Sequence, residues 1–281
     1  MDPSEGTVLR GYVSVMDPLR SVAGVSPPPP WTILEGRSPI VAAALHDGHE
    51  LRPEVEDLIG IAAPDRRREE DPYTGWLTNI VPARVIAHRS RFEFDLNRPP
   101  DQAVAVDAGD SWGLQIWKEP PPQAIVRASQ FLHAAFYSSL REMFTEIEAR
   151  SGRFAVLDIH SYNYRREGPD APPGDPATHP DVNVGTRSVD RRRWGHLVDR
   201  FMEDLSAHPL GLDVRENVKF KGRYLAAWTQ LTFPETGCCL ALEFKKTYMD
   251  EWTGEIDQER LRALADALSS TLPGLQEELF R

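Results

Sequence analysis

The chain has 281 residues, of which 41% are apolar, and its formal net charge is −11 because 43 acidic residues outnumber 32 basic ones. This length suffices for one large domain or two small ones, and the apolar content for a sizeable core; the sequence shows no clean domain boundary. The negative charge argues against a nucleic-acid partner, which requires a basic face. No apolar run approaches the ~18 residues of a membrane span, and the acidic, polar N-terminus lacks a signal-peptide pattern. We therefore expect a cytoplasmic protein with no membrane partner.

The first third of the chain predicts strands and helices in alternation. A proline run at 27–30 cannot form a helix or a central strand and ends an N-terminal extension, residues 1–30. Hydrophobic spacing and the position of Pro72 in a first helical turn identify the elements that follow. These are strands at 40–46, 82–88 and 91–96, and helices at 51–61 and from an N-cap at Asp71.

The remainder of the chain continues this alternation. Residues 164–180 contain five prolines and two glycines, which predicts a long loop and a mobile lid. The other expected elements are a loop at 99–122, helices at 124–150, 188–207 and 257–281, and strands at 154–160 and 238–244. We therefore expect a single α/β domain over 1–281, with a largely parallel or mixed sheet between helical layers.

The only cysteines, Cys238 and Cys239, are adjacent. Neighbours on a strand point to opposite faces, so a structural disulfide between them is not expected. A cysteine-based metal site would need more of them. We expect both to be buried core residues of a strand.

Two apolar strands each deliver a histidine to their C-terminal end, where open α/β sheets keep their sites. His46 ends the strand 40–46 and His160 ends the strand 154–160. Two imidazoles, a carboxylate and a water would complete a catalytic zinc site. The third ligand remains open among four residues, which are His49, Glu69, Glu70 and Asp71.

Glu243 lies between Leu242 and Phe244 in an apolar strand. A carboxylate in such a position is costly unless it is paired or used. One interpretation is a salt bridge to Lys245 or Lys246. The other is a general base whose raised pKa suits it to take a proton from a metal-bound water.

Arg98 follows the strand 91–96 and precedes two prolines that fix its exit. A guanidinium held in this way can bind a substrate carboxylate with two hydrogen bonds. The alternative is a structural ion pair with Asp95. Arg91, at the other end of the strand, is a second candidate.

Several motifs occur together in one order. Residues 90–99 read SRFEFDLNRP, and residues 240–251 read LALEFKKTYMDE. Between these two segments lie HSY at 160–162, DVNVGT at 181–186 and FKGR at 220–223. In these segments the chain resembles the N-formylglutamate amidohydrolase family and, more distantly, the zinc carboxypeptidases. The matches run from His46 to Glu251.

The resemblance implies a three-layer phosphorylase/hydrolase-like fold and one Zn²⁺ per chain. It implies that His46 and His160 are metal ligands and that Glu243 is the base. It makes Asn97 and Arg98 the anchors of a substrate carboxylate, while Arg91 polarises the scissile carbonyl or holds a second carboxylate.

The chain also departs from the family pattern. The acidic ligand of the family aligns with Glu70 or Asp71: the register favours Asp71, and the longer reach of Glu70 keeps it open. Arg223 replaces the second glycine of the family's Lys-Gly-Gly turn. We therefore count Arg223 among the substrate-binding residues, favouring an acidic or larger substrate.

These expectations combine into zinc-dependent hydrolysis of an amide bond in an N-formyl or N-acyl amino acid, or a similar small carboxylate. Two alternatives are a carboxypeptidase-like peptidase and a non-catalytic carboxylate-binding protein of the same fold. The partner expected is a small-molecule carboxylate, and the sequence allows a homo-oligomer.

Overall fold

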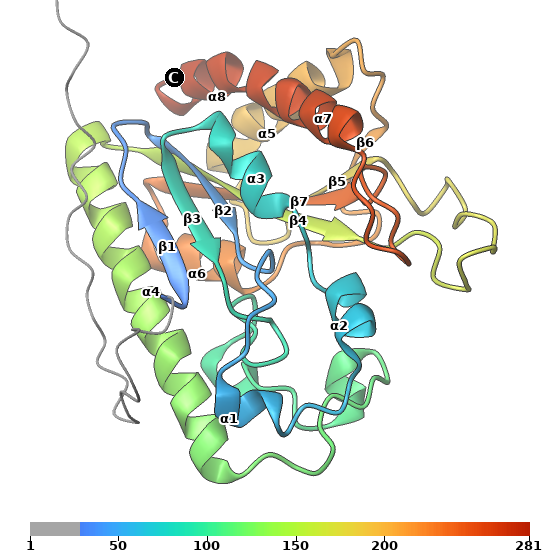
Figure 1. The fold of residues 1–281 in the computed structure, drawn as a ribbon. Coiled ribbons are helices and arrows are strands. Elements are labelled where there is room, and N and C mark those ends of the chain that lie inside the picture. Colours follow the sequence, from blue (N-terminus) through green and yellow to red (C-terminus); the bar gives the residue numbers. More distant parts are fainter. Residues whose placement is uncertain (1–28) are drawn as a thin grey trace, which may run out of the picture.

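The computed structural model describes residues 29–281, so nearly all of the predicted N-terminal extension 1–30 lies outside the described residues. The described chain is built on a seven-stranded mixed sheet with the strand order β1-β3-β2-β4-β7-β5-β6 (Figure 1). The strands are β1 Trp31–Leu34, β2 Ile40–Ala44, β3 Ala83–Ala87, β4 Phe154–Tyr162, β5 Val182–Gly185, β6 Val214–Glu216 and β7 Gly237–Lys245. β3, β2, β4 and β7 run parallel, β1 is antiparallel to β3, and β5 is antiparallel to β7.

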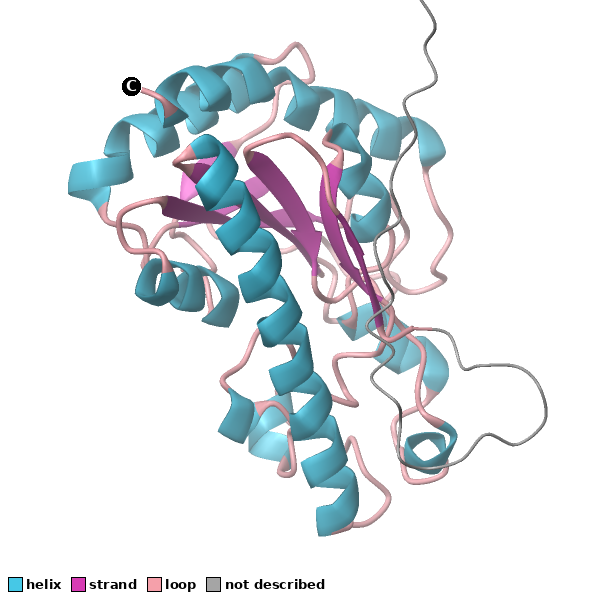
Figure 2. Cartoon of the chain, turned by 90° about the vertical axis from the view of Figure 1, so that its left-hand side faces the viewer, coloured by secondary structure: helices cyan, strands magenta, loops and turns pink. Residues whose placement is uncertain are grey.

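Helices cover both faces of this sheet, and Figure 2 shows the long helix α4 lying across one of them. The helices are α1 Pro53–Glu56, α2 Ala63–Glu69, α3 Thr74–Leu77, α4 Gln123–Ser151, α5 Arg191–Ala207, α6 Tyr224–Thr232, α7 Gln258–Ser270 and α8 Leu272–Leu279. One core cluster lies beneath α5, α7 and α8, and a second lies beneath α4 and α6. The predicted α/β class, a mixed sheet between helical layers, is confirmed.

β4 and β7 form the centre of the sheet, paired over nine residues from Phe154↔Gly237 to Tyr162↔Lys245. Alternation along the strands sends Leu157 and Ile159 to the α5 side, and Val156 and Cys239 to the α4 side. Both cysteines are free and buried, as predicted. Polar residues appear near the carboxyl ends of these strands, at the edge where open α/β sheets hold their sites.

Two predicted elements are wrong. Residues 91–96 form turns instead of a strand, because the alternating polar side chains point inward: Glu93 binds Arg52, and Asp95 binds His46. Within the predicted helix 51–61, only α1 is helical.

Three helix boundaries also differ from the expected ones. α3 begins after Tyr73, so Asp71 is not an N-cap. α5 begins at Arg191, where the carboxylate of Asp190 accepts from the backbone N–H of Arg192. The expected C-terminal helix is two helices, α7 and α8, which meet at Thr271. The helix predicted at 124–150 is confirmed as α4.

The predicted loop at 164–180 contains no helix or strand, and contacts hold both of its ends. At its start, the buried carboxylate of Glu251 accepts hydrogen bonds from the backbone N–H groups of Tyr164 and Arg165, at 2.8 and 2.9 Å. At its end, the Arg215 guanidinium donates to the carbonyls of Pro176 and Ala177. No helix within residues 29–281 is long and apolar enough to cross a lipid bilayer.

Candidate metal centre and active site

Three side chains from separate parts of the chain converge at the carboxyl edge of the sheet. His46 follows β2, Asp71 lies between α2 and α3, and His160 belongs to β4. The His46 and His160 Nδ1 atoms are 3.1 Å apart, and Asp71 Oδ2 lies 3.3 Å from the first and 3.1 Å from the second. All three side chains are buried, and they form a group of His and carboxylate residues with the geometry to hold a metal ion.

The spacing of these atoms suits zinc. Tetrahedral ligands at bond lengths of about 2.0–2.1 Å lie about 3.3 Å from one another. The three observed distances, 3.1–3.3 Å, are close to that edge length. Two imidazoles and one carboxylate leave a fourth position for water, which is the donor set of catalytic zinc.

Second carboxylates hold the two imidazole rings in place. His46 Nε2 lies 2.7 Å from Asp95 Oδ1, and His160 Nε2 lies 2.9 Å from Asp158 Oδ1. A ring that donates from Nε2 presents an unprotonated Nδ1 to a metal, and such partners fix the ring and raise its basicity. Asp158 was not identified from the sequence, although its place two residues before His160 puts both on one face of β4.

The charges of this centre are strongly coupled. Burial opposes the charge on Asp71, but hydrogen bonds from His160 and His46 outweigh it and hold the pKa of Asp71 below its usual range. Burial likewise opposes a charged His160, yet the charge of Asp158 raises the pKa of His160 well above its ordinary value. The buried carboxylates therefore favour positive charge at this point, which a divalent cation would supply.

Glu243 stands directly beside the centre. It is the register partner of His160 in the parallel β4–β7 pair, so both side chains point to the same face. Burial raises the pKa of Glu243 to about 8, although His160 and Arg91 oppose this shift. Neither nearby lysine pairs with it: Lys245 binds Asp181, and Lys246 donates to two backbone carbonyls.

Asp95 links the centre to the two arginines predicted from the sequence. Arg91 Nη2 lies 2.8 Å from Asp95 Oδ2, and Arg98 Nε lies 3.3 Å from the same oxygen. The structural ion pair between Arg98 and Asp95, considered from the sequence, is therefore present. Asn97 accepts from the backbone N–H of Leu225 through Oδ1, which turns its Nδ2 to within 3.1 Å of His160 Nε2.

A pocket of about 610 Å³ opens beside these residues. Three arginines contribute to its wall: Arg98, Arg223 and Arg187, the last of which was not predicted from the sequence. Trp112 and Tyr224 add aromatic surface. The pocket thus brings together all three predicted substrate-binding residues, Asn97 included, next to the candidate metal ligand His160.

The other acidic and histidine candidates lie outside the metal cluster. Glu70 is buried and accepts a hydrogen bond from the Ser90 hydroxyl, and Glu69 pairs with Arg166. His49 is exposed. Of the alternatives left open for the third ligand, only Asp71 joins the two histidines.

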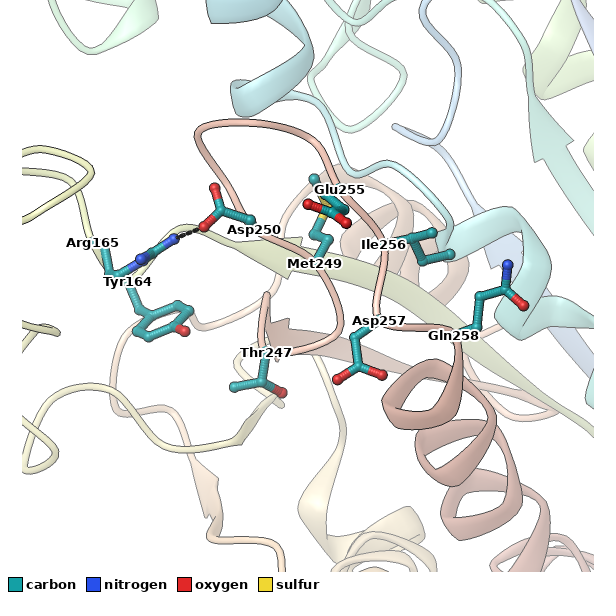
Figure 3. Close-up of a pocket in the computed structure, with 9 residues that line it drawn as sticks. All are labelled: Tyr164, Arg165, Thr247, Met249, Asp250, Glu255, Ile256, Asp257 and Gln258. Carbon is teal, nitrogen blue, oxygen red and sulfur yellow. Dashed lines mark hydrogen bonds and ion pairs between the residues drawn. The ribbon is translucent and has the colours of Figure 1, made fainter.

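A second hollow, of about 700 Å³, lies where the loops after β4 and β7 meet (Figure 3). In Figure 3, the side chain of Arg165 points toward Asp250, with which it forms an ion pair. None of the three clustered ligand residues lines this hollow. It is therefore separate from the candidate metal centre.

Comparisons with known proteins agree with this arrangement. The family model for N-formylglutamate amidohydrolase matches residues 38–249. A structure of N-formylglutamate amidohydrolase from Ralstonia eutropha JMP134 superposes with a TM-score of 0.68 at 20% identity, covering 88% of this chain and 97% of that one. A gene product of Agrobacterium tumefaciens gives 0.65 at 18% identity, covering 89% and 96%. No curated protein matches by sequence.

The structural matches show a shared fold, since their identities are low. The family match carries more weight, because it spans β2 to β7, the candidate metal cluster and Glu243. The motifs noted in the sequence also fall within this range, apart from the last two residues of the segment 240–251. The chain therefore belongs to the N-formylglutamate amidohydrolase family.

Proposed function

We propose that this protein hydrolyses the amide bond of an N-acyl amino acid, using one zinc ion held by His46, Asp71 and His160. The observation that carries the proposal is the buried set of three ligand atoms 3.1–3.3 Å apart, with Glu243 next to it. A bound zinc ion acidifies a water molecule and polarises a carbonyl.

Glu243 serves as the general base in this proposal. Its raised pKa lets it accept a proton from the attacking water and later return it to the departing amine. Arg91 lies on the same side, since its charge acts on Glu243. Its guanidinium is therefore suited to stabilise negative charge on the acyl oxygen.

The substrate carboxylate is bound in the pocket beside Asn97. Arg98 and Arg223 line this pocket, so a carboxylate there meets positive charge within reach of the metal centre. Holding the carboxylate fixes the distance to the scissile carbonyl. The substrate class is thus a small molecule that carries a free carboxylate on its amine half.

The test combines metal analysis with a substrate screen. We expect about one zinc per purified chain, and hydrolysis of N-formyl or N-acetyl amino acids. Glu243→Gln should keep the zinc and lose about 100-fold or more of kcat, the usual scale of general base catalysis. His49→Gln is the matched control for His46→Gln: it should keep both zinc and activity, whereas His46→Gln should lose both.

Two results would reject the proposal. One is normal turnover by Glu243→Gln, which would remove this residue from the mechanism. The other is equal zinc binding by wild type and His46→Gln, which would place the metal elsewhere.

A further inference from the structure

Lys219 is a cation with no anionic partner in the part of the chain that the structure describes. Its side chain is half-buried, and among residues 29–281 it forms no ion pair. The ammonium lies 5.3 Å from the ring centre of Tyr162 and donates to His179 Nε2 at 2.8 Å. In a chain with 43 acidic residues, a partly buried ammonium that contacts only neutral groups is available to an external anion.

The segment that carries Lys219 is fixed firmly beside the active site. The buried amide of Asn183 accepts from the backbone N–H groups of Lys219 and Phe220, at 2.8 and 3.2 Å, and donates to the Phe220 carbonyl at 2.8 Å. Asn183 is the register partner of Glu243 in the antiparallel β5–β7 pair. The backbone of Lys219 is therefore held next to the strand that lies alongside Glu243.

Tyr162 relates Lys219 to the metal centre. Tyr162 and His160 are two residues apart on β4, so their side chains share a face and lie about 6.6 Å apart along the strand. The Tyr162 ring packs against Phe220 and His179, with the ammonium of Lys219 also near it. Lys219 thus belongs to a cluster with Tyr162, Phe220 and His179 that lies one strand repeat beyond His160.

This cluster lies away from the arginine pocket. The same segment continues to Gly222, whose backbone contacts Gly185, and Gly185 pairs with Ala241, two positions before Glu243. Gly222 and Arg223 line the arginine pocket, whereas Lys219 does not. The segment 219–223 therefore presents positive charge at two levels of β7. Lys219 lies at the level of Glu243, and Arg223 lies nearer to the level of Ala241, the pairing partner of Asp158.

We propose that Lys219 determines acyl-group specificity by binding an anionic group at the far end of the acyl half of the substrate. This inference rests on the proposed function, which assigns the arginine pocket to the amine half. The acyl half then extends toward Tyr162 and Lys219. A short acyl chain that ends in a carboxylate, such as succinyl or glutaryl, supplies the missing anion.

The electrostatic environment leaves the ammonium of Lys219 short of counter-charge. Burial and the charge of Arg166 lower the pKa of Lys219, while Glu243 opposes them. His179 is free to receive the hydrogen bond because its Nδ1 lies 3.0 Å from the Asp175 carbonyl, which accepts from a protonated Nδ1. A bound carboxylate would add the counter-charge that neither the ring nor the imidazole provides.

The experiment compares N-succinyl and N-succinamoyl derivatives of one amino acid, which have the same shape and differ in the terminal charge. We expect wild type to favour the charged compound by about tenfold or more in kcat/KM, the scale of a charge-assisted hydrogen bond. Lys219→Met should abolish this preference while leaving N-formyl hydrolysis unchanged, and Lys219→Arg should restore part of it. Lys221→Met, which removes an exposed charge from the same segment, is the matched control.

The outcomes separate this inference from the proposed function. If wild type hydrolyses N-formyl compounds but shows equal kcat/KM for the N-succinyl and N-succinamoyl compounds, the role of Lys219 is overturned and the proposed function stands. An equal loss on all substrates in Lys219→Met also overturns it. If nothing is hydrolysed, calorimetric titration of the zinc-loaded protein with the two compounds decides: equal affinities refute the inference.

Discussion

Asp158 is the residue that most directly tests the metal centre without touching the metal. Its carboxylate lies 2.9 Å from His160 Nε2 and is fully buried. Asp158→Asn keeps the shape and removes the charge that supports this ring. We expect zinc affinity to fall by about 10- to 100-fold, measured by competition with a chromogenic chelator. Unchanged affinity would mean that the ring needs no carboxylate partner.

His133 gives a pH-dependent prediction. Burial lowers the pKa of His133, which donates from Nε2 to the Arg98 carbonyl in its neutral form. The folded state therefore resists protonation, and its stabilising contribution is complete above about pH 6.5 and is lost as the pH falls through the folded value. Relative to His133→Gln, wild type should lose up to about 1.4 kcal/mol of unfolding free energy per pH unit in that window.

Denaturant unfolding between pH 8 and pH 5 measures this difference. The exposed His49 supplies the control, because His49→Gln should follow the wild-type curve. Parallel curves for wild type and His133→Gln would contradict the prediction.

At single positions, the sequence identified residues whose role follows from strand position. His46 and His160 each stand at a strand end, and both are in the cluster. Glu70 and Asp71 could not be separated, because the choice depends on which neighbour faces inward. The backbone N–H of Asp71 binds the His46 carbonyl, and Glu70 turns toward Ser90. The hydrogen bond between Asp71 and His46 joins segments that are distant in the chain, so no local sequence pattern indicates it.

At the scale of elements, the close approach of β5 to the 219–223 segment sets the shape of the arginine pocket. A Cβ on Gly185 would lie 2.4 Å from the backbone nitrogen of Gly222, so Gly185→Ala must displace that backbone. We expect kcat/KM to fall by about 10- to 100-fold through misplacement of Arg223, with zinc content unchanged. Steady-state kinetics and metal analysis check both parts.

Gly195 in α5 provides the matched glycine control, since a Cβ there meets nothing within 4 Å. Gly195→Ala should stabilise the protein by about 0.5–1 kcal/mol because alanine favours the helix. It should leave kcat/KM unchanged. A Gly185→Ala variant as active as Gly195→Ala would show that the pocket tolerates a shifted turn.

The elements predicted correctly are those with long, regular patterns. α4, β4 and β7 bury continuous or periodic apolar residues, and their patterns reflect local burial. The strand predicted at 91–96 is wrong because its polar side chains, Glu93 and Asp95, are buried and bind Arg52 and His46. Alternation of polar and apolar residues alone cannot show which side of a segment faces water. β5 and β6 have four and three residues, which is too short for an alternating hydrophobic pattern to be recognised in the sequence.

At the scale of the whole molecule, the metal would join segments that are far apart in the chain. His46, Asp71 and His160 come from the segment after β2, the α2–α3 connection and β4, so an ion between them would be bound only by the folded protein. A ligand at 100 times its Kd adds about 2.7 kcal/mol of stability. We therefore expect chelation by EDTA to lower the melting temperature of wild type by roughly 5–10 °C, measured by differential scanning calorimetry.

Asp71→Asn separates metal loss from general effects of the chelator. This variant lacks a charged ligand, so EDTA should shift its melting temperature little, and its transition should resemble that of chelated wild type. The exposed Glu119 gives a control, since Glu119→Gln should retain the full EDTA response. Equal shifts in wild type and Asp71→Asn would contradict a structural link through this centre, because the stabilisation would then come from a metal bound elsewhere.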